Sequence, residues 1–138
     1  MIDKINIYNK ERQSGKTSIL KLKAVDVSLK YYDKVIFSSY NINECKEHER
    51  YFDGLYNGNN ITINKYKQID FIRTDLLVAN LRGKDYKNIL LLIDEPFLNG
   101  LEIQDKLLHF LEESNIIFHI LGYGTECNNF KQFKDYIK

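Results

Sequence analysis

One apolar run limits the possible folds of this chain more than any other segment: Ile89-Leu90-Leu91-Leu92-Ile93, followed at once by Asp94 and Glu95. A half-buried strand alternates apolar and polar residues, whereas a parallel strand covered by helices on both faces is apolar throughout. We therefore expect this segment to be the central strand of a parallel sheet. Its carboxyl end then delivers two carboxylates to one edge of that sheet.

Further strands and helices are predicted on both sides of this run. Short apolar or alternating segments indicate strands at residues 4–8, 35–37, 61–63 and 116–121. Apolar residues at three- and four-residue steps indicate helices at residues 16–29, 69–79, 103–111 and 130–136. The charged run 44–50 indicates a solvated helix or loop. Strands that alternate with helices predict an α/β fold, here a three-layer α/β/α sandwich with a mainly parallel sheet.

The length and charge of the chain restrict its class. Its 138 residues suffice for one domain of ordinary size, so we expect a single domain spanning residues 1–138. Twenty Lys and Arg residues against 19 Asp and Glu residues give a net charge of +1, which excludes a broad basic field for nucleic acid or anionic membranes. No apolar stretch approaches the roughly 20 residues of a membrane span, and the start lacks the apolar core of a signal peptide. We therefore expect an intracellular protein without a membrane partner.

The strongest functional motif is Ser14-Gly15-Lys16-Thr17, between the first predicted strand and the first predicted helix. Backbone N–H groups at a helix start can surround a phosphate, and the helix dipole favours its negative charge. Lys16 would reach the β- and γ-phosphates of a nucleotide, and the Thr17 hydroxyl would ligate Mg²⁺. The full phosphate-loop pattern has glycine where this chain has Lys10, so the match is degenerate.

Asp94 and Glu95 supply the acidic half of such a site. Ligands bind at the carboxyl edge of open parallel sheets, so Asp94 would face the phosphate loop if its strand neighbours the first strand. Asp94 is expected to hold Mg²⁺, and Glu95 is expected to be the base or water-orienting residue for attack on the γ-phosphate. The two elements together predict a P-loop NTPase fold.

Three segments resemble the genome-packaging ATPases of poxviruses and other large DNA viruses, which belong to the FtsK and HerA-like translocases: Ser14 to Leu20, Tyr32 to Tyr40 and Leu90 to Glu95. The resemblance extends in order and spacing from about Ile5 to Tyr123. It implies a Mg²⁺-dependent ATPase that binds ATP, with double-stranded DNA as a partner and a homo-oligomer as the assembly. The location that it implies is the host cytoplasm or the virion.

The resemblance also assigns site residues. The nucleotide site would comprise seven consecutive residues: Arg12, Gln13, Ser14, Gly15, Lys16, Thr17 and Ser18. Thr17 and Asp94 would hold the metal, and Lys16 and Glu95 would be catalytic. Ring motors complete their site with an arginine of the neighbouring subunit. Arg82, between a predicted helix and the acidic strand, is the candidate for that catalytic role.

Two other functions fit the same residues. Thymidine kinases also carry a Ser-Gly-Lys-Ser/Thr loop and an Ile-Asp-Glu segment with a following Phe, which Ile93 to Leu98 resembles. Those kinases close the nucleoside site with a cysteine-rich zinc region, for which the two cysteines of this chain do not suffice. Lys10 favours the other alternative, a nucleotide-binding or structural viral protein without turnover, because a long cationic side chain would crowd the backbone's approach to the phosphates.

The cysteines and histidines form no metal motif in the sequence. Cys45 and His48 have ligand-like spacing but offer only two of the four ligands of a structural zinc site. His109 and His119 lie in a predicted helix and a predicted strand, where core or surface positions are the expectation. We therefore predict free thiols and no zinc site.

Overall fold

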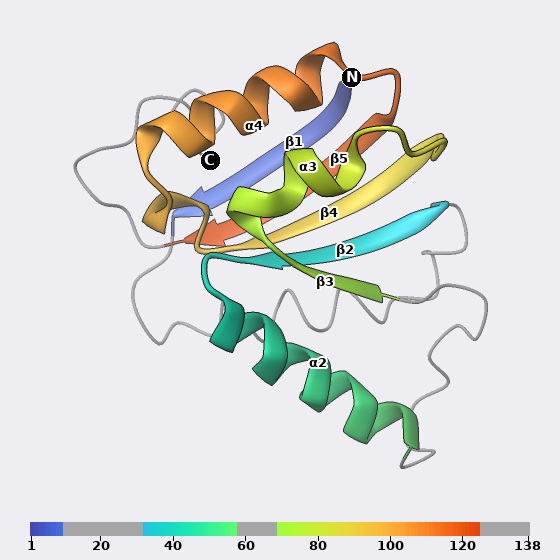
Figure 1. Cartoon of the computed structure of the whole chain (residues 1–138), viewed down its shortest axis with the longest axis vertical. Coiled ribbons are helices and arrows are strands. Elements are labelled where there is room, and N and C mark those ends of the chain that lie inside the picture. Colours follow the sequence, from blue (N-terminus) through green and yellow to red (C-terminus); the bar gives the residue numbers. More distant parts are fainter. Residues whose placement is uncertain (10–31, 58–68, 125–138) are drawn as a thin grey trace.

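Five parallel strands form the centre of the structure (Figure 1). The computed structural model describes residues 1–9, 32–57 and 69–124. The strands are β1 (Ile2–Asn9), β2 (Lys34–Ser39), β3 (Ile69–Arg73), β4 (Asn88–Asp94) and β5 (Ile117–Gly124). Their order across the sheet is β1-β5-β4-β2-β3, and every neighbouring pair is parallel. The predicted α/β fold with a parallel sheet is therefore confirmed.

Helices cover both faces of this sheet (Figure 1). α2 (Ile42–Asn57) lies on one face, and α3 (Leu77–Leu81) and α4 (Leu101–Glu113) lie on the other. Each face has its own apolar core. The α2 side gathers Val35, Phe37, Phe52, Leu90 and Leu92. The larger core on the opposite side includes Ile7, Leu77, Leu81, Ile93, Leu107, Leu111 and Phe118. The described elements thus form three layers.

β4 is the central strand, as its composition predicts. Residues 89–94 are all buried, and the side chains of residues 89–93 alternate between the two cores. Complete burial of one Leu or Ile side chain contributes about 1.5–3 kcal/mol, so this strand stabilises both faces at once. The position of β4 also fixes where Asp94 and Glu95 lie, at the carboxyl edge of the sheet between β5 and β2.

The helix predicted over residues 69–79 is wrong in its first half. Ile69–Arg73 is strand β3, Thr74–Leu76 is a short 3₁₀ helix, and α3 begins only at Leu77. The apolar spacing fits a helix, but β-branched and aromatic residues suit a pleated surface, and pairing with β2 gives them hydrogen-bond partners. α3 ends at Leu81, and Gly83 just beyond it has a φ of 77°, the left-handed conformation in which glycine commonly ends a helix.

The other predictions have mixed outcomes. The strands at 4–8, 35–37 and 116–121 and the helix at 103–111 are confirmed with slightly different ends. The charged run 44–50 belongs to α2, but two of its residues, Cys45 and His48, are buried and not solvated. The strand at 61–63 and the helices at 16–29 and 130–136 lie outside the described residues. Within the described ranges, no helix combines the length and apolar character needed to cross a bilayer.

Candidate functional site

One register row at the carboxyl edge of the sheet carries the polar side chains of the site. Asp94 of β4 is paired with Ser39 of β2 on one side and with Tyr123 of β5 on the other. The row continues to Tyr8 of β1 and Arg73 of β3. Because residues of one row share a face of the sheet, these side chains lie on the side covered by α2. The first turns of α2 therefore face Asp94.

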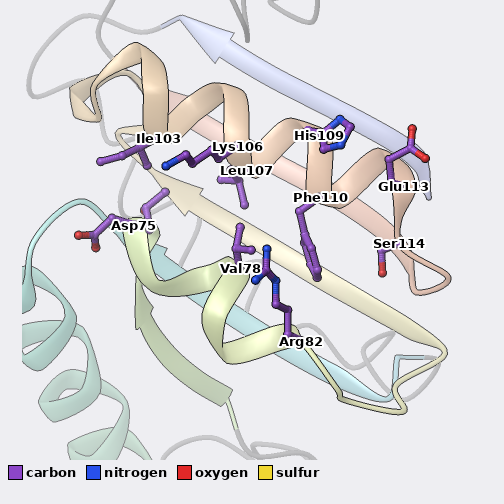
Figure 2. A pocket seen from close by; sticks show the side chains of 11 residues that line it. Asp75, Val78, Arg82, Ile103, Lys106, Leu107, His109, Phe110, Glu113 and Ser114 are labelled. Carbon is purple, nitrogen blue, oxygen red and sulfur yellow. The ribbon is translucent and has the colours of Figure 1, made fainter.

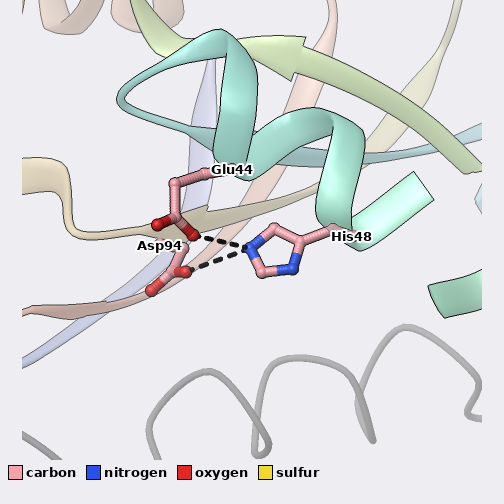
Figure 3. Close-up of side chains that lie close together, drawn as sticks. All are labelled: Glu44, His48 and Asp94. Carbon is pink, nitrogen blue, oxygen red and sulfur yellow. Dashed lines mark ion pairs between the residues drawn. The ribbon is translucent and has the colours of Figure 1, made fainter. Parts of the chain in front are cut away.

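α2 brings two further ligand-type side chains to Asp94 (Figure 3). The Asn41 side-chain oxygen accepts a hydrogen bond of 2.8 Å from the Glu44 N–H, which is the usual cap of a helix start. Glu44 and His48 then share one face of α2, because residues four apart are neighbours on a helix. His48 Nε2 lies 3.3 Å from Asp94 Oδ2 and 3.7 Å from Glu44 Oε2.

His48 is almost completely removed from water. Its side chain is 4% exposed, that of Asp94 is 6% exposed, and that of Glu44 is 38% exposed. The imidazole packs on the Phe37 ring, with ring centroids 4.8 Å apart. Within the described chain neither ring nitrogen has a hydrogen-bond partner. The ring nitrogen Nε2 thus lies at ion-pair distance from two carboxylates but forms a hydrogen bond with neither (Figure 3).

The three side chains form a compact donor set. One ligand atom from each of Glu44, His48 and Asp94 can be chosen so that all three lie within 4.8 Å of one another. Two carboxylate oxygens and one imidazole nitrogen are donors for divalent cations. The carboxylates of Glu44 and Asp94 repel each other at this distance, and a cation bound between them removes that repulsion. The three side chains therefore provide donor atoms suited to a divalent metal ion.

Glu95 has an unusual backbone. Its φ of 56° and ψ of 57° place it in the left-handed region, and it is the single non-glycine residue with positive φ in the described chain. Its N–H donates a hydrogen bond of 2.9 Å to the Tyr123 carbonyl, and Pro96–Leu98 follows as a 3₁₀ helix. A left-handed conformation costs about 1–2 kcal/mol for a residue with a Cβ. Such strain concentrates at functional sites, where the surrounding structure holds it.

Two pKa shifts mark the apolar surroundings of the site. Burial raises the pKa of the Cys45 thiol, and the backbone of Ser39 and the charge of Arg73 oppose that shift. Burial also raises the pKa of the Tyr123 hydroxyl, with a smaller contribution from Tyr8, whose ring stacks on that of Tyr123 at 4.9 Å. Both groups are therefore neutral at neutral pH.

The residues predicted from the sequence have different outcomes here. Asp94 and Glu95 lie at the carboxyl end of the central strand, as expected. The strand of Asp94 does not neighbour the first strand, because β5 lies between β1 and β4. The seven residues predicted to bind nucleotide lie outside the described residues: Arg12, Gln13, Ser14, Gly15, Lys16, Thr17 and Ser18. Their assignment to nucleotide stays a prediction.

Arg82 lies far from Asp94 within the same chain. It follows α3 at the edge where β4 begins, and the seven residues of β4 span about 20 Å to the other edge. At the edge where β4 begins, Arg82 lines a groove of about 630 Å³ between α3 and α4, opposite Phe110 and next to Val78 (Figure 2). A catalytic role for Arg82 would require that it come from a second copy, so the role stays a prediction.

Sequence reasoning did not find the cluster of Glu44 and His48 with Asp94. Cys45, the residue that shared ligand-like spacing with His48, is not part of the cluster. The sequence contains one indication of it, the four-residue spacing of Glu44 and His48, because residues four apart are neighbours on a helix surface. Their contact with Asp94 arises only from the fold, which places α2 over the end of β4.

A second histidine, His119, also has side-chain contacts, and these lie away from the candidate site. His119 Nδ1 lies 2.6 Å from the Tyr32 hydroxyl, and its Nε2 lies 2.8 Å from Asp3 Oδ2. Burial, with a smaller contribution from the Asp3 charge, raises the pKa of the Tyr32 hydroxyl. This contact lies near the start of β5, toward the opposite edge of the sheet from Asp94.

Comparison of the chain with protein-family models and with curated proteins gives no match. The likeness to packaging ATPases therefore depends on the motif residues alone.

Proposed function

We propose that the chain binds a nucleoside triphosphate through a P-loop of residues 12–18 and hydrolyses ATP with Mg²⁺. One observation carries the proposal. β1, which precedes the Ser14-Gly15-Lys16-Thr17 sequence, and β4, which delivers Asp94 and Glu95, end at the same edge of a fully parallel sheet. That edge is where open α/β sheets bind their ligands.

The chain length between these elements allows the motif and the carboxylates to meet. Ser14 comes five residues after Asn9, the last residue of β1. Five residues span at most about 17 Å. The ends of β1 and β4 are separated by the one intervening strand, which corresponds to about 10 Å across the sheet. The insertion of β5 between the two strands is therefore no obstacle to a shared site.

The donors at the edge fit a magnesium ion. Asp94 offers a carboxylate that is nearly buried at the strand end. Mg²⁺ prefers oxygen ligands and is usually held by one or two carboxylates together with substrate phosphates. When bound, the ion would neutralise phosphate charge. Asp94 and the Thr17 hydroxyl would hold it, in keeping with the motif.

The remaining residues have separate tasks in this proposal. Lys16 supplies positive charge to the β- and γ-phosphates. Glu95, the first residue after β4, orients a water molecule and accepts its proton. ATP hydrolysis of the DNA-packaging type adds double-stranded DNA as the partner that stimulates turnover.

Nucleotide binding is tested by calorimetric titration of ATP, GTP and thymidine into the full chain with Mg²⁺. We expect ATP to bind and the Lys16→Ala variant to lose that binding, because the variant lacks the charge that reaches the phosphates. Lys84→Ala is the matched control, since Lys84 is exposed near the opposite edge of the sheet. Equal ATP affinity in the Lys16→Ala variant, or no nucleotide binding by the folded chain, overturns the proposal. Binding of thymidine favours the kinase alternative.

Turnover is tested by phosphate release with and without double-stranded DNA. We expect Glu95→Gln to keep nucleotide affinity and to lower the rate by about a hundredfold or more, the usual effect of losing a positioned base. Glu102→Gln is the control, because Glu102 is an exposed glutamate of α4. No phosphate release from a chain that binds Mg²⁺ and ATP would leave a binding protein and refute the ATPase.

A further inference from the structure

We propose that Glu44, His48 and Asp94 bind a first-row transition-metal dication of the Zn²⁺ type in the absence of nucleotide. The cluster shares Asp94 with the proposed nucleotide site, but its donors are complete without Lys16, Thr17 or a phosphate. The proposal concerns the side of Asp94 that faces α2 (Figure 3). It therefore stands whether or not the chain hydrolyses ATP.

The spacing of the three side chains suits such an ion. An ion bound at about 2.0–2.2 Å to nitrogen and oxygen ligands separates adjacent ligand atoms by about 3.0–3.5 Å. His48 Nε2 lies 3.3 Å from Asp94 Oδ2, which is inside this range, and 3.7 Å from Glu44 Oε2, which is slightly wider. Glu44 is the most exposed of the three, so its side chain can close the remaining gap.

The environment of His48 is the second, independent observation. A buried polar atom without a partner costs about 1–3 kcal/mol, and native proteins satisfy most such atoms. His48 Nε2 is buried, has no hydrogen-bond partner within the described chain, and lies at ion-pair distance from the two carboxylates. The Phe37 ring holds the imidazole in this orientation. A bound cation gives Nε2 the partner it lacks and removes the repulsion between Glu44 and Asp94.

The donor types decide which cation is bound. Imidazole nitrogen suits zinc, copper, iron and nickel, whereas magnesium and calcium prefer sites made of oxygen alone. Three protein ligands also leave coordination positions for water or a further group, as in open zinc sites. We therefore expect Zn²⁺ and Co²⁺ to bind to this cluster more tightly than Mg²⁺ or Ca²⁺.

The test uses Co²⁺ and Zn²⁺ alone as probes on the full chain without nucleotide. Co²⁺ reports its ligands by visible absorption, and calorimetry gives the affinity of Zn²⁺. We expect one equivalent of each ion to bind. Glu44→Gln and His48→Gln should each weaken binding by at least about tenfold, since even the loss of a group that only orients a metal ligand costs about 10- to 100-fold. Mg²⁺ at about 1 mM should not displace the bound Co²⁺.

The control is His109→Ala, which removes an exposed histidine of α4 outside the cluster and should leave Co²⁺ binding unchanged. Because His48 is buried, its variant is first checked for folding by circular dichroism. Glu44→Gln alters a half-exposed residue and keeps the test valid if the His48 variant does not fold. No Co²⁺ or Zn²⁺ binding by the folded chain, or binding that Glu44→Gln leaves unchanged, overturns the proposal and leaves a purely structural ion pair.

The metal proposal and the ATPase proposal fail separately. Co²⁺ binding without any ATP binding refutes the nucleotide site and keeps the metal site. ATP binding lost in the Lys16→Ala variant, together with no binding of Co²⁺ or Zn²⁺ to the unmodified chain, does the reverse. Asp94→Asn is unsuitable for this distinction, because both proposals use that carboxylate.

Discussion

Gly122 of β5 leaves little room for a Cβ atom, and its substitution by alanine gives a quantitative test of the packing. A Cβ atom at position 122 would lie 2.7 Å from Ile7 Cδ1, with the Ile93 carbonyl oxygen at 3.5 Å and Pro96 Cγ at 3.6 Å. Carbon atoms pack at about 3.5–4.0 Å, so Ile7 must move by roughly 1 Å. Ile7 is fully buried, and close packing in protein interiors leaves a buried side chain little room to shift.

We expect Gly122→Ala to lower the free energy of unfolding by about 1–3 kcal/mol, the usual cost of an extra methyl group in a filled core. Ile7→Val removes the Cδ1 atom that clashes and by itself costs about 0.5–1.5 kcal/mol. In the double variant the new methyl group occupies the space that Cδ1 has left. The two substitutions should therefore be coupled by at least about 1 kcal/mol in the favourable direction.

The assay is urea denaturation of all four chains, followed by circular dichroism. Gly100→Ala is the matched control, because nothing lies within 4 Å of a Cβ at that position, and its effect should add to that of Ile7→Val. If Gly122→Ala and Ile7→Val add within about 0.5 kcal/mol, the contact does not limit the packing and the reasoning is refuted.

Two further predictions concern Glu95 and Cys45. In urea denaturation, Glu95→Gly should be more stable than Glu95→Ala by about 1 kcal/mol, because glycine adopts the left-handed backbone without a Cβ clash. Equal stability of the two variants would show that the backbone at this position changes on substitution. Because burial raises the pKa of the native Cys45 thiol, the unfolded chain releases this proton first as the pH rises. The free energy of unfolding should therefore fall above about pH 8.5, the ordinary thiol pKa. Cys45→Ala should reduce that fall between about pH 7.5 and about pH 9.5, and an unchanged slope would contradict the shift.

The layered fold could be predicted because its central strand is apolar without interruption. Ile89 to Ile93 has a composition that few other structures accept, and the structure places it where that composition requires, between two cores. The segment from Ile69 was harder because its apolar spacing fits a helix and a strand equally. The partner strand β2 decides between them, and no local pattern contains that pairing.

The candidate site could be predicted only in part for the same reason. Asp94 and Glu95 follow directly from the strand that carries them, so their position at the sheet edge was predictable. The contact of His48 with Asp94 joins residues that are far apart in the sequence. It requires the parallel register of β2 and β4 and the start of α2 at the end of β2. These are properties of the assembled sheet and not of any short motif.

The pairing of β1 with β5 affects how this chain folds during its synthesis. β1 leaves the ribosome before its partner in the described sheet, β5, which begins about 115 residues later. At about 5–20 residues per second, the interval is on the order of ten seconds. Throughout that time the core that Ile7 joins is incomplete, because it includes Phe118 of β5. The nascent chain therefore carries β1 unpaired, with Ile7 open to chaperones and to wrong partners, until β5 is made.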